Sequence, residues 1–131
     1  MIVLFTDFGL AGPYTGQVSA VLHETAPAVP VIQLFADAPA AQPKPSAYLL
    51  AAYGAWFPAA TVLLCVVDPG VGGARRGVIV EAGGRLYVGP DNGLFELVLR
   101  RGLVAIVTVD FLGKMSHVSV RACPPESVIV R

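Results

Sequence analysis

An apolar run that ends in a glycine-rich loop constrains this chain more than any other stretch. Residues 61–67 are nearly all β-branched or apolar and do not alternate with polar residues, which predicts a strand covered on both faces. Asp68 stands where that strand would end, and Pro-Gly-Val-Gly-Gly-Ala-Arg-Arg follows it. Open parallel sheets bind ligands at the carboxyl ends of their strands, so we expect a site here.

The residues of this loop favour a polar pocket. Pro69 fixes one backbone angle, and the glycines among residues 70–73 permit positive φ and close backbone approach. We expect Arg75 to fold back toward Asp68, so that a carboxylate and a guanidinium face one small molecule. The alternative is an ordinary Asp-Pro-Gly turn with solvated arginines.

The rest of the chain predicts an α/β fold. Apolar runs predict strands over residues 1–5, 29–35 and 103–109, and residues 77–82 and 85–88 flank Gly83-Gly84 as a hairpin. Proline positions and apolar spacing predict helices between residues 12 and 27, over 46–57 and over 94–101. This order predicts a mostly parallel sheet flanked by helices in Rossmann-like layers, with one β-hairpin.

Helical spacing also predicts which side chains pack. Ser46 is expected to cap the second helix and Asn92 to cap the third. The expected packing positions are Val18, Val21 and Leu22 in the first helix and Tyr48, Leu49, Ala52 and Tyr53 in the second.

Composition bounds the partners. The formal net charge is zero and only 14% of the residues are charged, which argues against nucleic acid or an anionic membrane surface. No apolar run approaches the roughly 20 residues that a membrane span needs. Because 55% of the residues are nevertheless hydrophobic, we expect part of the apolar surface to be buried between the subunits of a homo-oligomer. Cys65 and Cys123 are far apart and no signal peptide precedes them, which favours reduced thiols in a cytoplasm.

The first strand ends in a second acidic motif. Thr6-Asp7-Phe8-Gly9 follows it, so Asp7 matches Asp68 as a carboxylate at a strand end. Asp7, Asp37, Asp68 and Asp91 are dispersed and do not form a metal-ligand cluster, so we expect no metal. Walker, Gly-x-Gly-x-x-Gly and Gly-x-Ser-x-Gly motifs are absent. The remaining set suits hydrogen bonds to a ribose or to a polarised water.

Several blocks resemble one enzyme family. They are Thr6-Asp7-Phe8-Gly9, Pro13-Tyr14, Gly16-Gln17, Tyr48-Leu49-Leu50, Phe57-Pro58, Val66-Val67-Asp68-Pro69-Gly70-Val71-Gly72, Arg75-Arg76 and Gly89-Pro90-Asp91-Asn92-Gly93-Leu94. In order and spacing they resemble the amino-terminal domain of the S-adenosyl-L-methionine hydrolases, also called hydroxide adenosyltransferases. These enzymes are related to the fluorinating and chlorinating enzymes that use the same substrate.

The resemblance implies an activity without a cofactor. It implies attack of water or hydroxide on the ribose C5′ of S-adenosyl-L-methionine, which yields adenosine and L-methionine and needs no metal. By similarity Asp68 and Arg75 would position the water together with a histidine, and Asp7 would hold the ribose hydroxyls. By the same similarity, Phe8, Gly9 and Tyr14 would also bind the substrate. The halogenating relatives lack the aspartate and arginine of this water site.

The chain departs from the family in its last part. The resemblance covers residues 1–110, and residues 111–131 form an atypical tail. The family block Ser-x-Ser/Thr-Phe-His-Gly-Arg-Asp, which carries the catalytic histidine, is absent, and Ser116-His117 is a fragment of it. The carboxyl-terminal β-barrel, which completes the adenine pocket of a neighbouring subunit in a trimer, is also absent, as truncation or a frame change would produce.

Two main interpretations therefore remain. One is a hydrolase that uses Asp68, Arg75 and His117, and the other is an inactive oligomerising or ligand-binding remnant of the family. A metal-dependent phosphohydrolase that uses Asp7 and Asp68 is a third, more remote alternative.

Overall fold

A computed structural model describes residues 1–101, 104–109 and 117–119. These residues form a sheet of seven strands in the order β2-β1-β3-β5-β4-β6-β7. The strands are β1 (Ile2–Thr6), β2 (Val31–Phe35), β3 (Val62–Val66), β4 (Gly77–Ala82), β5 (Arg85–Pro90), β6 (Val104–Val109) and β7 (His117–Ser119). The helices are α1 (Tyr14–Thr25), α2 (Pro43–Gly54) and α3 (Glu96–Leu99).

The sheet is mostly parallel, as the sequence predicts. Strands β2, β1, β3 and β5 pair in parallel. Strand β4 is antiparallel to both β5 and β6, and β7 is antiparallel to β6. It follows that β6 runs with the parallel set, and only β4 and β7 oppose it.

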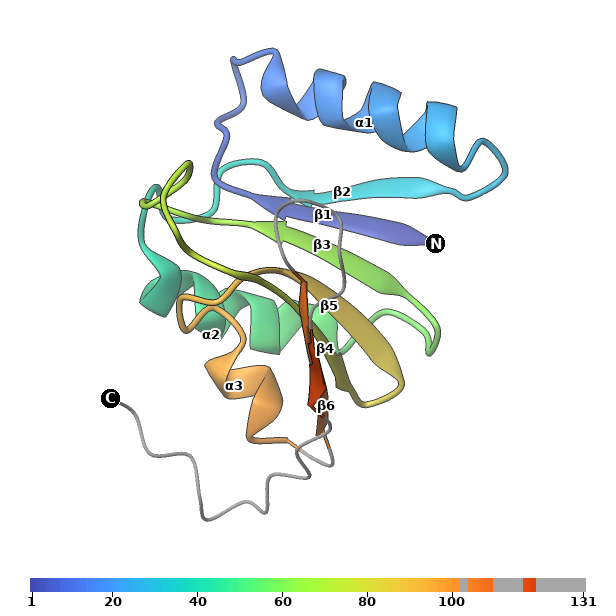
Figure 1. The fold of residues 1–131 in the computed structure, drawn as a ribbon. Coiled ribbons are helices and arrows are strands. Elements are labelled where there is room, and N and C mark those ends of the chain that lie inside the picture. Colours follow the sequence, from blue (N-terminus) through green and yellow to red (C-terminus); the bar gives the residue numbers. More distant parts are fainter. Residues whose placement is uncertain (102–103, 110–116, 120–131) are drawn as a thin grey trace.

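The helices cover the two faces of the sheet unequally (Figure 1). Helix α1 lies on one side, next to β2, while α2 and α3 lie on the other side. Since α1 joins β1 to β2 and α2 joins β2 to β3, these two connections cross opposite faces of the sheet. In the described part of the chain, no helix is both long enough and apolar enough to cross a bilayer.

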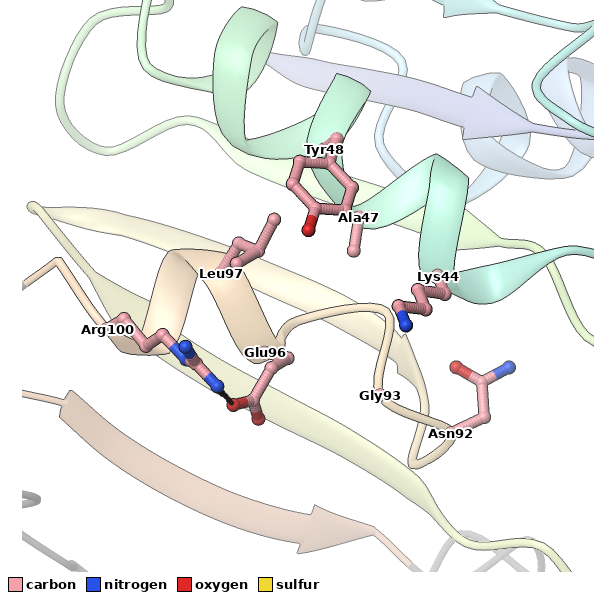
Figure 2. Close-up of a pocket in the computed structure, with 8 residues that line it drawn as sticks. All are labelled: Lys44, Ala47, Tyr48, Asn92, Gly93, Glu96, Leu97 and Arg100. Atoms are coloured by element: carbon pink, nitrogen blue, oxygen red, sulfur yellow. Dashed lines mark hydrogen bonds and ion pairs between the residues drawn. The ribbon is translucent and has the colours of Figure 1, made fainter. Parts of the chain in front are cut away.

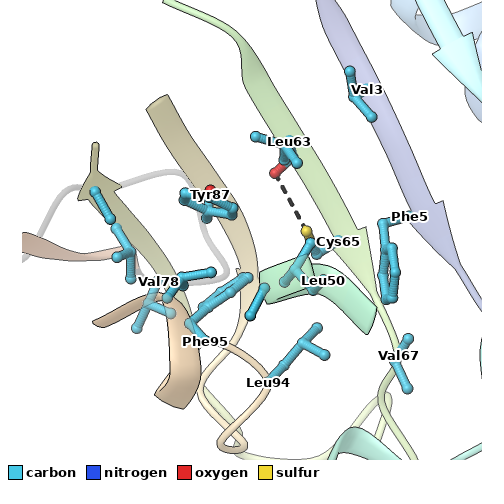
Figure 3. Close-up of a cluster of buried hydrophobic side chains, with 14 of the residues drawn as sticks. Val3, Phe5, Leu50, Leu63, Cys65, Val67, Val78, Tyr87, Leu94 and Phe95 are labelled. Atoms are coloured by element: carbon cyan, nitrogen blue, oxygen red, sulfur yellow. Dashed lines mark hydrogen bonds between the residues drawn. The ribbon is translucent and has the colours of Figure 1, made fainter. Parts of the chain in front are cut away.

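The hydrophobic core lies between the sheet and the pair α2 and α3. Figure 3 shows Val3 and Phe5 of β1 and Leu63 and Cys65 of β3 facing Leu50 of α2. The rings of Tyr87 and Phe95 close the other end, with centroids 6.1 Å apart. In β1, β3 and β4 the core residues therefore come from alternate positions, which fixes the register of these strands.

The packing face predicted for α2 is wrong except at Leu49, which is half-buried against the core. Helix α2 begins three positions before Ser46, at Pro43, so Ser46 is buried inside the helix instead of capping it. The buried positions of α2 are Ser46, Ala47, Leu50, Ala51 and Gly54. Tyr48 is 62% exposed because it points away from this buried face, and Tyr53 is 47% exposed at the flank of the helix, where its ring packs on Phe35 with centroids 5.7 Å apart.

Helix α1 departs from its predicted face at Val21, whereas Val18 and Leu22 are half-buried. It has no buried residue, and Val21 is 60% exposed. The reason is its position beside β2, an edge strand, where only one neighbouring strand lies beneath it.

The strand before the glycine-rich loop is fully covered on one face and only partly covered on the other. In β3 the buried residues Leu63 and Cys65 alternate with half-buried Val62, Leu64 and Val66. The prediction of a strand buried on both faces is therefore wrong.

The hairpin is confirmed and the third helix is shorter than expected. Both turn glycines of the hairpin, Gly83 and Gly84, have positive φ, at 58° and 72°. Helix α3 covers only Glu96–Leu99, because the residues just before it form a turn.

Candidate functional site

Asp7 and Asp68 follow neighbouring strands at the same edge of the sheet. Thr6 of β1 pairs with Val66 of β3, and the amide of Asp7 donates to the carbonyl of Val66 over 3.3 Å. The chain leaves β1 toward the α1 side of the sheet, while β3 continues into the loop of residues 68–76, here called the 68–76 loop. Such a point, where connections diverge at the carboxyl edge, is the usual ligand site of an α/β sheet.

Arg75 folds back onto Asp68, as the sequence predicted. Its Nε lies 3.0 Å from Oδ1 of Asp68, with 33% of the arginine side chain and 13% of the aspartate side chain exposed. Nε is buried and its N–H is not aligned on an oxygen, so the contact is ionic and not a hydrogen bond. The same Oδ1 accepts the Gly70 amide over 2.9 Å, which fixes the carboxylate.

The 68–76 loop needs its glycines for two different reasons. Gly72 has a positive φ of 85°, whereas the other two glycines of this loop are not among the positive-φ residues. At Gly70 the absence of a side chain leaves room for the Arg75 guanidinium, because a carbon added there would lie 2.6 Å from Nη2 of Arg75. The sequence predicted positive φ and close approach for these glycines without assigning either to one residue. The structure shows positive φ at Gly72 and close approach of a side chain, that of Arg75, at Gly70.

A cavity of about 470 Å³ borders the ion pair. Its polar wall holds Asp68, Arg75 and Arg76. Its apolar wall holds the half-buried side chains of Leu64, Val66, Ile79 and Val88. These side chains alternate with core residues, so they point to the sheet face opposite α2 and α3. A carboxylate and a guanidinium thus stand at the mouth of an apolar recess.

The first-strand residues lie at the same edge but outside this cavity lining. Oδ2 of Asp7 accepts the amide of Ala41 over 2.7 Å, which directs the carboxylate toward the loop after β2. Gly9 has a positive φ of 87°, and its amide donates to the carbonyl of Ala36 over 2.7 Å. The ring of Phe8 packs on Tyr14, with centroids 5.9 Å apart.

His117 is not brought to Asp68. It lies on β7, opposite Thr108 of β6, and β7 is the fourth strand along from β3. Neighbouring strands are about 4.8 Å apart, so roughly 19 Å of sheet separates the two backbones. Cys123 and the rest of the tail lie outside the described residues.

Two further titratable groups belong to the core. Burial raises the pKa of the Cys65 thiol far above its ordinary value, which argues against a nucleophilic role. Burial also raises the pKa of Tyr87, against a smaller opposing effect of Arg85. His23 is exposed on α1. Over the described residues, no three His, Cys, Asp or Glu side chains gather as a metal site would require.

A second cavity of about 380 Å³ lies between α2 and α3. Figure 2 shows Lys44 and Tyr48 of α2 across from Glu96 and Arg100, with Asn92 at one end. Nη2 of Arg100 lies 2.7 Å from Oε1 of Glu96. The lining shares no residue with the first cavity, and Tyr48, expected in the core, stands at its border.

Sequence reasoning missed one contact that bears on the site. Asn92 does not cap the third helix as expected, because α3 begins at Glu96 with Phe95 at its N-cap. Instead, Nδ2 of Asn92 donates to the carbonyl of Val67 over 2.8 Å. The turn-rich cluster around it was visible in the sequence, but nothing there indicates which distant carbonyl an asparagine will reach.

Comparison with known proteins identifies the family. Residues 2–122 match the model of the SAM hydroxide adenosyltransferase N-terminal domain. A protein of Thermus thermophilus named (R)-S-adenosyl-L-methionine hydrolase is 46% identical over 96 residues, which are 73% of this chain and 37% of that protein. A protein of Salinispora tropica with the same name is 44% identical over 113 residues, or 82% of this chain and 43% of that protein.

A solved structure agrees with these matches. The crystal structure of a conserved hypothetical protein from Thermus thermophilus superposes with a TM-score of 0.72 at 40% identity and covers 83% of this chain and 46% of that one. The chain thus spans less than half the length of these relatives. By its match over residues 2–122, the chain belongs to the SAM hydroxide adenosyltransferase family and corresponds to the amino-terminal domain of that family.

Proposed function

We propose that this chain hydrolyses S-adenosyl-L-methionine to adenosine and L-methionine. In this reaction a water oxygen bonds to the ribose C5′ as the C5′–S bond breaks. The electron pair of that bond passes to the sulfonium, which leaves as the uncharged thioether of methionine, and one water proton is released. The observation that carries the proposal is the Asp68–Arg75 ion pair at the mouth of a recess on the carboxyl edge.

Asp68 and Arg75 have the chemistry to hold the attacking water. Oδ1 of Asp68 is engaged by Gly70 and Arg75, whereas Oδ2 makes no hydrogen bond to the rest of the described chain. Oδ2 is therefore the oxygen that would accept a hydrogen bond or proton from the water. The guanidinium would favour hydroxide character at the same place.

The leaving group explains why two side chains suffice. A sulfonium departs without protonation, so the protein mainly has to orient the water and exclude competing solvent. We therefore propose no metal or cofactor. Asp7 would bind the ribose hydroxyls from the neighbouring strand, with Phe8, Gly9 and Tyr14 beside it. We assign no step to His117, since its strand is remote from β3.

The test is adenosine release by the purified chain incubated with S-adenosyl-L-methionine. Loss of a group that accepts the water proton typically lowers a rate by about 100-fold or more, so Asp68→Ala is expected to abolish most of the release. Arg100→Ala is the matched control, because it removes a different ion pair, with Glu96, at a separate cavity. Adenosine release that is absent, or equal in wild type and Asp68→Ala, contradicts the proposal.

A second candidate function has its own observation. The wall formed by Leu64, Val66, Ile79 and Val88 is only half-buried, and Leu10 of the first loop is 80% exposed. Apolar surface of this kind favours self-association, so we propose an oligomer, a trimer by family resemblance. If the chain forms a closed trimer by light scattering and releases no adenosine, it acts as an assembly or ligand-binding domain. We place either function in the cytoplasm, where the Cys65 thiol would stay reduced.

A further inference from the structure

The turn after β5 holds both ends of the 68–76 loop. Residues 90–93, here called the 90–93 turn, carry the Pro-Asp-Asn-Gly motif. At the start of the loop, Nδ2 of Asn92 donates to the carbonyl of Val67 over 2.8 Å. At its end, the amide of Asp91 donates to the carbonyl of Arg76 over 3.0 Å. One short turn therefore fixes the residue before Asp68 and the residue after Arg75.

The Asn92 bond replaces a sheet bond that cannot form. The parallel register of β3 and β5 ends at Leu64 and Val88. Pro90, two residues further along β5, has no amide hydrogen with which to continue the ladder, and Val67, just after β3, is completely buried. A buried carbonyl without a partner is unfavourable, and the side chain of Asn92 supplies the missing donor.

Asn92 is itself held in one orientation. Its side-chain Oδ1 accepts a hydrogen bond from the backbone amide of Leu94 over 3.2 Å. Its backbone amide donates to the carbonyl of Pro90 over 3.0 Å. Leu94 is completely buried in the core, so the acceptor end of the amide is fixed. Because one end accepts from an amide, the other end must be the NH₂ group that faces Val67.

From these contacts we propose that Asn92 is a positioning residue for the water site. By fixing the Val67 carbonyl, Asn92 sets the position and orientation of the Asp68 carboxylate relative to the Arg75 guanidinium. It touches neither the substrate nor the attacking water. This inference rests on the proposed hydrolase function, because it concerns how Asp68 is held for that reaction.

The test compares Asn92→Ala and Asn92→Asp with wild type in adenosine release. Asn92→Asp keeps the shape and the acceptor for Leu94 but places an oxygen against the Val67 carbonyl. Misplacement of a catalytic group by about 1 Å costs roughly 100-fold, so kcat should fall about 10- to 100-fold in both variants. KM should stay within about threefold, because Asn92 does not line the proposed cavity.

Thr61→Val is the matched control at the other end of β3. Thr61 is buried, and its hydroxyl donates to the carbonyl of Pro58 over 2.8 Å, the same length as the Asn92 bond. This variant should lose stability but keep kcat. The positioning role is contradicted if Asn92→Asp keeps kcat within twofold of wild type. It is also contradicted if Thr61→Val lowers kcat as much as Asn92→Asp does.

A second readout separates this inference from the proposed function. If wild type itself releases no adenosine, the hydrolase proposal fails, and amide hydrogen exchange at Gly70 then decides the role of Asn92. The Gly70 amide donates to Asp68, so it reports whether the carboxylate is in place. If the Gly70 amide exchanges about tenfold faster in Asn92→Asp and at the wild-type rate in Thr61→Val, the positioning role of Asn92 is supported. Equal exchange in wild type, Asn92→Asp and Thr61→Val overturns it. If Asn92→Ala does not fold, Asn92→Asp carries both comparisons.

Discussion

Arg75 reaches Asp68 because the residue that it passes, Gly70, has no side chain. The guanidinium lies where a methyl group on Gly70 would stand, with Nη2 only 2.6 Å from that position. The backbone of Gly70 does not have positive φ, so alanine can adopt its conformation. The ion pair can therefore be disturbed without straining the loop.

Gly70→Ala should separate activity from stability. The added methyl would displace the flexible end of Arg75, so the free energy of unfolding should change by less than about 1 kcal/mol. Adenosine release should fall roughly 10- to 100-fold, because the guanidinium leaves Asp68. Urea denaturation and the release assay measure the two effects.

The control for this variant is Gly16→Ala, where the added carbon meets nothing within 4 Å. It should keep full activity. A Gly70→Ala variant as active as wild type would mean that Arg75 does not act from its position beside Asp68.

For the helices and strands, the sequence predicted their positions along the chain better than the side chains that they bury. Every strand through residue 109 was found within two residues of its predicted position, because apolar runs and turn residues mark strand ends well. Helix faces failed at Tyr48 and Val21, because the apolar residues on α1 and α2 are too many for spacing to select one face. The Asp68–Arg75 pair was predictable from one loop, whereas the Asn92 contact joins residues 25 positions apart.

The close approach of β5 to β3 depends on Gly89. A carbon added there would collide with the carbonyl oxygen of Cys65 and lie 2.9 Å from Cζ of Phe95, which is buried. A backbone carbonyl cannot move aside as a flexible side chain can, so the two strands would have to separate. Gly89 therefore sets the spacing of the elements that carry the 68–76 loop and the 90–93 turn.

Gly89→Ala should lower the free energy of unfolding by about 2 kcal/mol or more, as overpacking of a core does. Gly54→Ala is a graded comparison, since its added carbon comes no closer than 3.3 Å to its neighbours. It should cost distinctly less. Equal losses in urea denaturation would show that β5 does not need the close contact.

In the whole molecule, one face of the sheet is buried under α2 and α3 and the other is only half-covered. The buried face holds Cys65 and Tyr87 against α2 and α3. Burial raises the pKa of both groups, so the folded protein favours their neutral, protonated forms. The unfolded chain loses these protons at lower pH than the folded chain does, and stability must therefore fall in alkali.

The protein should unfold more easily as the pH rises above the ordinary thiol value of 9.0. Below that pH the contribution of Cys65 is fully present. Above it the free energy of unfolding should fall by about 1.4 kcal/mol per pH unit for this group. Urea denaturation from neutral to alkaline pH measures the slope, and Cys65→Ala should reduce it. An identical slope in both proteins would contradict this origin.

In the proposed reaction, the Asp68–Arg75 pair directs a water molecule to C5′ of S-adenosyl-L-methionine. The most direct measurement is hydrolysis in ¹⁸O-labelled water, followed by mass spectrometry of the products. We expect adenosine that carries the label at its 5′ oxygen, unlabelled methionine, and loss of labelled adenosine in Asp68→Ala. Unlabelled adenosine, or labelled adenosine formed equally well by Asp68→Ala, would contradict the proposed reaction.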